Sequence, residues 1–477
     1  MTTKRALAAG TSRVSTPRVV VLGAGLAGLL AAAALRGHPD VGRVSIVERD
    51  RLPDAPRPRP GVPQARQAHV LMSSGARAVD DLLPGMTERW LAAGARRIGL
   101  PDGYVMLLAE GWLPRWTGEQ FVIACSRDLL DWVVRRRVLD LPGVELRERT
   151  EVVGLCGGPR SVTGVRVRDR DSAREEVLDA ALVVDATGRG SQAPHWLGAL
   201  GGPPVGQDVV DSGLRYATRI FRAPDTAPQD FPVVNVQADP GLGRPGQTAA
   251  LIPIEDGRWL VTLSGTRGGR PSSVEHEFVP FAASLRHPIV AELIAGAEPL
   301  GPVAVTNGTA NRRRYFERLP VWPDGFVVIG DAVATYNPVY GHGMSVAAFG
   351  ARILRDELAV GGLRSGLART VQRRVACATA PAWELATGTD IRFPEAIGRA
   401  PARLERLLWR YQSRLFRTAL DRADLARELI EVFTLSAPTR RLLRPRVAWA
   451  TLRGPRRPAI DAPPFTDAER TALRTTI

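Results

Sequence analysis

VVVLGAGLAG, at residues 19–28, places a β-branched run directly before three glycines in GxGxxG spacing. The Ala- and Leu-rich residues 29–35 that follow predict a helix, so the segment is typical of a buried strand, a tight turn and a helix start. In such a turn the first glycine turns the chain, the second admits a diphosphate, and the third lets helix and strand pack closely. The free N–H groups at the helix start bind phosphate oxygens. We therefore expect dinucleotide contacts from Gly23, Gly25, Leu26, Ala27 and Gly28.

A second predicted strand, at residues 44–47, ends at an acidic residue, Glu48. It completes the strand–helix–strand order of one Rossmann unit. A carboxylate about 20 residues beyond the glycine turn can accept hydrogen bonds from the ribose hydroxyls of an adenosine. We therefore assign Glu48 and its neighbour Arg49 to the adenosine end of the ligand.

The choice between a flavin and a nicotinamide rests on a second segment near residue 330. Residues 327–329 predict a strand that ends at Gly330 and Asp331, and NPVYGHGM at residues 337–344 leads into a predicted helix. A carboxylate at that strand end can hold the ribityl hydroxyls of a flavin, and the helix start can stabilise negative charge on the flavin ring. A nicotinamide dehydrogenase has no use for this element. FAD is therefore the expected cofactor, with further contacts from Pro338, Gly341, Gly343 and Met344.

Hydrophobic periodicity divides the rest of the chain. Apolar runs at residues 18–22, 44–47, 182–184 and 326–329 predict a parallel sheet, and residues 127–139 and 343–358 predict helices. Short strands from residue 144 to 178 predict an inserted β-meander. Strands between residues 205 and 319, with a hairpin turn at Asp256-Gly257, predict a mainly antiparallel sheet. The leucine-rich stripe at residues 404–420 predicts a helix that packs on the body.

The expected fold class is α/β, with four segments. Residues 1–17 form a flexible tail, and residues 18–204 with 310–360 form a discontinuous Rossmann-type FAD-binding domain. Residues 205–309 form a substrate-binding β-sheet domain, and residues 361–477 form a helical region.

Charge and composition are those of a soluble globular protein, with 44% hydrophobic and 24% charged residues. The formal net charge of +15 comes almost wholly from arginine, because Lys4 is the single lysine. Arginines cluster between residues 440 and 457, and such a patch suits nucleic acid, an anionic membrane or an acidic carrier protein. No nucleic-acid-binding motif accompanies the patch, so we favour a solvated surface and expect no nucleic-acid partner.

The sequence contains no pattern typical of a disulfide, a metal site or a transmembrane segment. Three cysteines without a CxxC pair and six histidines without HxxxH spacing predict neither disulfides nor a metal site. The longest apolar stretch, residues 19–35, is interrupted by glycines, so we expect no transmembrane segment. The apolar patch near the start is shorter than a signal-peptide core, which favours a cytoplasmic protein.

Over residues 18–358 the chain resembles the class A flavoprotein monooxygenases, which share the fold of para-hydroxybenzoate hydroxylase and squalene epoxidase. The resemblance rests on the glycine turn, on Gly330-Asp331 and on the Ser126-Arg127 pair. It implies that Arg127 contacts the flavin diphosphate and ribityl region, and that the backbone at Val152 contacts the adenine. Residues 61–71 and 337–344 are similar to segments of bacterial flavin epoxidases that act on polyene precursors of polyether antibiotics.

The resemblance implies oxygen insertion, in which reduced flavin and O2 give a C4a-hydroperoxide that attacks an alkene or an electron-rich ring. Epoxidation of a large apolar polyene or polyketide in antibiotic biosynthesis is favoured. Hydroxylation of an aromatic polyketide, a reduction of the geranylgeranyl-reductase kind and non-catalytic flavin binding stay open. Halogenation is not expected. Flavin halogenases use a lysine to carry the halogen and contain a Trp-x-Trp-x-Ile-Pro pattern. This sequence lacks the pattern, and its single lysine, Lys4, lies in the predicted tail.

One departure from the family leaves the electron donor open. Where the family often has Asp-Gly, this chain has Asp185-Ala186. The resemblance links that motif to FAD and NAD(P)H handling, so a separate flavin reductase stands beside direct use of NAD(P)H. An acyl carrier protein is a further candidate partner.

Three side chains are candidate catalytic groups, namely Arg66, His69 and His342. Any of them could assist deprotonation of a phenol, but each also has a structural interpretation, as a diphosphate partner, an interior histidine and a loop-shaping residue. An isolated alkene needs no base, which favours epoxidation. Aromatic residues of the predicted sheet are candidates for the wall of an apolar substrate pocket, although such residues are more often core: Tyr216, Phe231 and Trp259.

Overall fold

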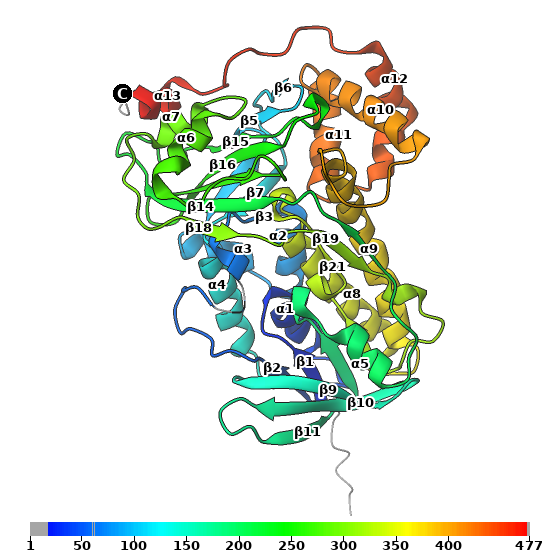
Figure 1. Cartoon of the computed structure of the whole chain (residues 1–477). Helices are drawn as coiled ribbons and strands as arrows, with labels where there is room; N and C mark the ends of the chain where they lie inside the picture. Colours follow the sequence, from blue (N-terminus) through cyan, green and yellow to red (C-terminus); the bar gives the residue numbers. More distant parts are fainter. Residues whose placement is uncertain (1–17, 60, 62, 475–477) are drawn as a thin grey trace, which may run out of the picture.

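A five-stranded parallel sheet forms the lower part of the computed structural model, which describes residues 18–59, 61 and 63–474 (Figure 1). The predicted tail, residues 1–17, lies outside the described residues. The strand order is β20 (Phe326–Val328), β12 (Leu182–Asp185), β1 (Arg18–Leu22), β2 (Arg43–Val47) and β8 (Val144–Arg147). The β1 side chains from Val19 to Leu22 are fully buried, as expected for the central strand of a sheet covered on both faces. The predicted α/β class with a parallel nucleotide-binding sheet is confirmed.

The strand at residues 144–147 corrects one detail of the prediction. We expected it in the β-meander, but β8 pairs in parallel with β2, with Val44 opposite Val144. The meander therefore has three strands only, β9 (Thr150–Gly158), β10 (Ser161–Asp169) and β11 (Glu175–Asp179). A short half-buried strand has the same alternating pattern whichever sheet it joins, so its sequence does not identify its partner.

Helices and the meander cover this sheet. α1 (Leu26–Leu35) is buried along almost its whole length and packs against α8 (Gly343–Gly361). α4 (Arg127–Leu139) packs on α1, and α2 (Ser73–Leu82) packs on α8. Shorter helices are α3 (Met86–Ala92) and α5 (Ala193–Ala199). The meander contributes Val162, Val165, Val167 and Leu178 to the same core.

A seven-stranded sheet forms the upper body. Its order is β18 (Ala304–Thr306), β14 (Arg215–Arg222), β17 (Arg258–Gly265), β16 (Gln247–Ile254), β15 (Val233–Val236), β5 (Tyr104–Leu108) and β6 (Gly111–Trp112). The predicted hairpin turn joins β16 to β17, with Asp256 and Gly257 both at φ +62°. α6 (Phe278–Ala283) and α7 (Ile289–Ile294) pack on one face. Because β5 and β6 come from outside residues 205–309, the sheet uses more of the chain than the segment that we predicted for it.

Two small sheets join the upper and lower parts. One consists of β3 (Val70–Met72), β7 (Gln120–Ala124) and β4 (Arg96–Leu100), and the other of β13 (Gln207–Val210), β19 (Asn311–Arg314) and β21 (Ala334–Thr335). From β19 the chain passes through β20 of the lower sheet and returns to pair β21 with β19, and the loop after β21 leads into α8.

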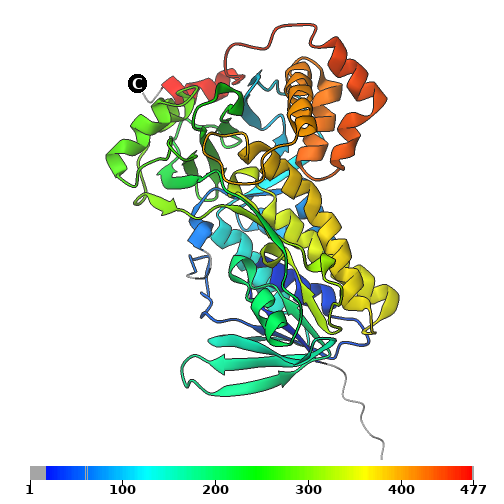
Figure 2. The ribbon, with the colours of Figure 1, turned by 45° about the vertical axis from the view of Figure 1, so that its right-hand side comes forward.

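The C-terminal part is helical. α9 (Leu367–Asp390) runs beside α8 and reaches α10 (Arg403–Ala419), α11 (Ala423–Phe433) and α12 (Pro445–Arg453) (Figure 2). The chain then crosses the top of the molecule to α13 (Asp467–Arg474), which contacts α7. Only the second half of the predicted leucine stripe packs on the body, since Leu415 and Leu420 are buried but Leu404 and Leu407 are exposed. None of the helices in the described ranges is long and apolar enough to cross a membrane.

A buried ion pair fastens the C-terminal crossing to the upper body. The Arg115 guanidinium donates to both Glu469 carboxylate oxygens, at 2.6 and 2.9 Å, and both side chains are largely buried. Phe465 lies beside Phe231, with ring centroids 6.2 Å apart, in the core under the crossing.

We expect Glu469→Gln to lower the free energy of unfolding by about 3 kcal/mol, because Arg115 would keep its charge without a counter-ion. Chemical denaturation measures this, and limited proteolysis at residues 455–465 reports release of α13. Glu176→Gln is the matched control, since its pair with Arg147 is exposed and contributes about 0–1 kcal/mol. Equal losses in the two variants would contradict the expectation.

Candidate functional site

The glycine turn has an open side. At Gly23, with φ +91°, a Cβ would lie 2.9 Å from the Ala186 carbonyl oxygen, and at Gly28 it would lie 1.9 Å from the Gly23 carbonyl oxygen. At Gly25 nothing lies within 4 Å of that position. Two of the glycines therefore serve close packing, and Gly25 leaves room for a ligand to approach the backbone.

Two helix starts lie together at this turn. α1 and α8 both begin without a side-chain cap and without an acidic residue in the first turn. Gly330, at φ +60°, packs so closely on α1 that a Cβ there would lie 2.9 Å from the Ala27 Cβ. Free N–H groups and the positive ends of two helix dipoles therefore lie close together, an arrangement that could bind an anionic group.

Asp331 lies between these helix starts and a set of arginines. A Cβ on Gly343 would lie 3.7 Å from the Asp331 carboxylate, which puts Asp331 beside the start of α8. Burial raises the pKa of Asp331, and the charges of Arg127, Arg189 and Arg312 oppose that rise. Arg127 stands at the start of α4, which Ser126 caps, and its Nε donates to Asp131 at 2.8 Å. Arg127 and Asp331, remote in sequence, are thus near enough for the charge of one to act on the other, and their assignment to the flavin ribityl region stays a prediction.

Glu48 binds an arginine that the sequence did not single out. Glu48 accepts from the Ala24 N–H at 2.8 Å and from Arg59 Nη2 at 2.9 Å, and Arg59 Nη1 donates to the Ala24 carbonyl at 2.8 Å. Arg59 belongs to the Pro- and Arg-rich loop 51–60, where no periodicity marks it. β9 begins beside Glu48, because the Thr150 N–H donates to the Glu48 carbonyl at 2.9 Å.

The assignments of Val152 and Arg49 to the adenosine end of the ligand remain predictions. Val152 follows Thr150 on β9 and is half-buried. Arg49 is exposed, and its Nε lies 3.7 Å from the Asp50 carboxylate.

Asp185 is used by its own turn. Its carboxylate accepts from the Thr187 N–H at 2.9 Å, from the Thr187 hydroxyl at 2.6 Å and from the Ser191 hydroxyl at 2.6 Å. Burial raises the pKa of Asp185, and these bonds oppose the rise. The side chain therefore shapes the β12 turn that packs on Gly23, and the electron donor stays an open prediction.

A buried carboxylate from α9 holds the loop that precedes α8. Asp390, at the end of α9, accepts from the Asn337 amide at 2.9 Å, from the Asn311 amide at 2.7 Å and from the Tyr340 hydroxyl at 2.7 Å. The Tyr216 hydroxyl donates to the Asn337 side chain and accepts from the Val339 N–H at 2.7 Å. Burial raises the pKa of Asp390, and the hydrogen bonds oppose the rise. A helix dipole disfavours a carboxylate at a C-terminus, so these donors compensate for its position.

The loop at residues 63–69 is fixed to the upper sheet through one glutamine. The Gln67 side chain accepts from the Thr218 hydroxyl and donates to the Thr306 hydroxyl at 3.0 Å. The neighbouring Ala68 N–H donates to the Thr262 hydroxyl at 3.0 Å. Gln67 is fully buried, although the sequence offers no sign of its partners.

The three candidate catalytic groups differ in environment. Arg66 is exposed. His69 Nδ1 lies 2.8 Å from the Gln67 carbonyl, and burial together with the Arg127 charge lowers its pKa to about 4. His342 is buried, its Nε2 lies 2.8 Å from the Phe433 carbonyl, and burial lowers its pKa to about 4. Both histidines are neutral at pH 7, and the His342 contacts suit the loop-shaping role.

The sheet aromatics do not share one face. The Tyr216 hydroxyl contacts the loop that precedes α8, as described above. The rings of Phe231 and Trp259 contact each other at a tilt of 33°, with centroids 4.9 Å apart, in the core that also contains α6 and α7. Side chains alternate along a strand, so the Trp259 face is opposite to the Thr262 face that meets Ala68. Phe231 and Trp259 are therefore core residues on the face opposite to Tyr216, and a pocket wall formed by these side chains stays a prediction.

Comparisons with known proteins agree with this geometry. The model of the FAD binding domain family matches residues 16–361. Protein Rv3254 of Mycobacterium tuberculosis (strain ATCC 25618 / H37Rv) is 34% identical over 445 residues, 89% of this chain and 90% of the relative. A kynurenine 3-monooxygenase of Salinispora arenicola (strain CNS-205) is 30% identical over 370 residues, 71% of this chain and 72% of the relative. The flavin-dependent brominase Bmp2 shares the fold, with a TM-score of 0.65 over 92% of this chain and 97% of its own, at 16% identity.

We expect Asp390→Ala to weaken FAD binding at least about tenfold, because each of three buried donors would lose its acceptor at about 1–3 kcal/mol. Fluorescence titration of the apoprotein with FAD measures the change. Tyr340→Phe removes one of those bonds and should weaken binding less. Asp208→Asn is the control, since that carboxylate also accepts from a tyrosine, Tyr315, at 2.5 Å but lies away from the loop. Unchanged FAD affinity in Asp390→Ala would refute this role.

Proposed function

We propose that this chain, which belongs to the FAD-binding domain family and is an FAD-dependent monooxygenase, adds one oxygen atom of O2 to a large apolar substrate. Epoxidation of an alkene, in a polyene or polyketide intermediate of antibiotic biosynthesis, is the reaction that we favour. The observation that carries the proposal is the contact of Gly330 with Ala27, which brings two uncapped helix starts together.

The residues present suit FAD. The start of α1 and the open side of Gly25 would receive the diphosphate, Glu48 and Arg59 the adenosine ribose, and Asp331 the ribityl chain. The start of α8 would face the edge of the flavin ring where negative charge develops on reduction. Bound FAD supplies the oxygen-activating chemistry, and the protein orients the substrate and excludes water.

The small number of side chains that could act as a base supports epoxidation. Arg66 is exposed and His342 is engaged with the Phe433 carbonyl, which leaves His69 as the candidate base in the described part of this region. Attack on an alkene transfers no proton from the substrate, so it needs no such group. Positioning then dominates the rate.

Aromatic hydroxylation is the second candidate, because a relative with 30% identity is named a kynurenine 3-monooxygenase. In that reaction His69, neutral at pH 7, would accept the proton of a phenol or an aromatic amine. Halogenation is not proposed. Although the chain shares the fold of a brominase, Lys4 is its single lysine.

The electron donor is proposed to be NAD(P)H or a separate flavin reductase, and an acyl carrier protein could present the substrate. Because Asp185 is occupied by its own turn, it offers no free carboxylate to a nicotinamide. We propose a cytoplasmic location for the protein.

The reaction is tested with the FAD-loaded protein, light-driven reduction in place of a biological donor, ¹⁸O2, and a set of apolar polyenes and phenols. We expect a polyene product that carries one ¹⁸O atom and is converted to a diol by acid hydrolysis. A labelled phenol product would favour the second candidate. Absence of label from every product, with O2 reduced only to peroxide, would overturn both.

His69→Gln separates the two candidates. For epoxidation we expect the rate of oxygen incorporation to stay within about threefold of the unchanged protein, with the same pH profile, because no base takes part. For aromatic hydroxylation, loss of the base should lower the rate by about 100-fold or more and remove one limb of the pH profile. FAD affinity is the control measurement, since His69 lies near Arg127 and the variant must still bind the cofactor.

A further inference from the structure

α12 exposes two large apolar side chains beside its arginines. Val447, Ala450 and Thr451 are buried, while Trp449 is 59% exposed and Leu452 is 62% exposed. The exposed face of a surface helix in a soluble protein is normally polar or charged. Leu443, at the end of the preceding 3-10 turn (Thr439–Leu443), is also exposed.

Exposed leucines continue onto a neighbouring helix. Leu404, Leu407 and Leu408 are exposed on the first turns of α10. The Tyr411 hydroxyl of α10 donates to the Leu442 carbonyl at 2.6 Å, and Arg414 Nε donates to the Thr451 carbonyl at 2.8 Å. These bonds hold α10 against the 3-10 turn and α12.

Positive charge surrounds these apolar side chains. Residues 436–457 contain seven arginines and no acidic residue. Arg441 and Arg446 pair with Glu428 of α11. Among the residues that the structure describes, the other five form no ion pair: Arg440, Arg444, Arg453, Arg456 and Arg457.

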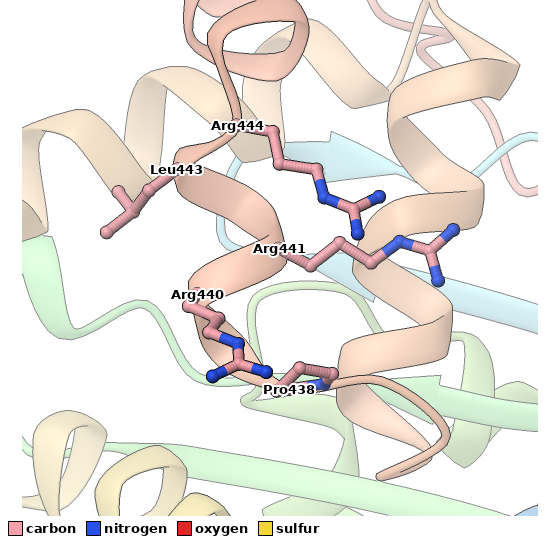
Figure 3. Close-up of a pocket in the computed structure, with 5 residues that line it drawn as sticks. All are labelled: Pro438, Arg440, Arg441, Leu443 and Arg444. Carbon is pink, nitrogen blue, oxygen red and sulfur yellow. The ribbon is translucent and has the colours of Figure 1, made fainter.

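The arrangement of these groups resembles that of interfacial segments. The Arg453 guanidinium lies 5.0 Å from the centre of the Trp449 ring. In Figure 3 the guanidinium groups of Arg441 and Arg444 extend to one side of the turn, and Leu443 projects to the other. Exposed apolar and cationic side chains therefore occur in the same short segment, and Arg453 lies directly beside Trp449.

We propose that this C-terminal patch (Leu443, Trp449, Leu452 and the unpaired Arg440, Arg444 and Arg453) docks on an anionic lipid surface. Indole and leucine side chains enter the headgroup boundary, and arginines bind lipid phosphates in bidentate fashion. A protein partner would need a shaped acceptor for Trp449, whereas a lipid surface accommodates side chains that project from a convex helix face. Docking would place the enzyme where a large apolar substrate dissolves, but the binding itself does not depend on the proposed reaction.

Vesicle co-sedimentation of the FAD-loaded full chain tests the proposal. We expect binding to vesicles of equal parts phosphatidylcholine and phosphatidylglycerol, little binding to phosphatidylcholine alone, and weaker binding as salt is added, because salt screens exposed charges. The double variant Trp449→Ser, Leu452→Ser should lose at least about tenfold in affinity for the anionic vesicles. The control is Val177→Ser with Val360→Ser, two exposed apolar residues away from the patch.

A second pair of variants tests the charge. Arg444→Gln with Arg453→Gln should weaken vesicle binding, and the control Arg160→Gln with Arg174→Gln, exposed on the meander, should not. The flavin absorbance spectrum verifies that each variant is folded. Failure to bind anionic vesicles overturns the proposal. A second outcome also overturns it. In that outcome the protein forms a dimer in sedimentation velocity or captures an acidic carrier protein, and the Trp449→Ser, Leu452→Ser variant loses this association but still binds vesicles.

Discussion

The contact between Gly330 and Ala27 is the constraint on which the site depends. A side chain at Gly330 would push the β20 turn away from α1, and the two uncapped helix starts would then no longer face one ligand. The same principle of close backbone approach operates at Gly23 against Ala186 and at Gly28 against the turn itself. The shape of the cofactor site thus depends on close packing among three backbone segments, namely the glycine turn, the turn after β12 and the turn after β20. Asp331 lies in the last of these turns, and the charge of Arg127 acts on its carboxylate.

Features with a local signal were predictable from the sequence. The central strands β1, β2 and β12 are buried on both faces and therefore appear as continuous apolar runs, and the glycine turn specifies its own geometry. Hydrogen bonds between polar residues that are far apart in the sequence were not predictable. Arg59, Gln67 and Asp390 meet partners 11, 151 and 53 residues away, and no periodicity marks such pairs. Strand alternation shows that Phe231 and Trp259 are inside, but not which face of the sheet meets the cofactor domain.

The helical region after residue 361 takes part in the site, although the family match ends there. Asp390 from α9 holds the loop before α8, and the Phe433 carbonyl from α11 holds His342, the residue at the start of α8. The loop at residues 337–342 has the sequence NPVYGH and contains one short 3-10 turn of its own. Hydrogen bonds from α9 and α11 hold this loop in place, so the helical region would influence a cofactor bound there through the loop.

α11 connects the loop before α8 to the exposed C-terminal patch through few contacts. Glu428 lies on α11, five residues before Phe433, and it binds Arg441 and Arg446 next to the exposed C-terminal patch. One side of α11 therefore supports the start of α8, and the other side supports the 3-10 turn and α12. Packed helices transmit displacement because interiors are dense and have few voids. α11 thus connects the exposed C-terminal patch to the start of α8, through Glu428 at one side and the Phe433 carbonyl at the other.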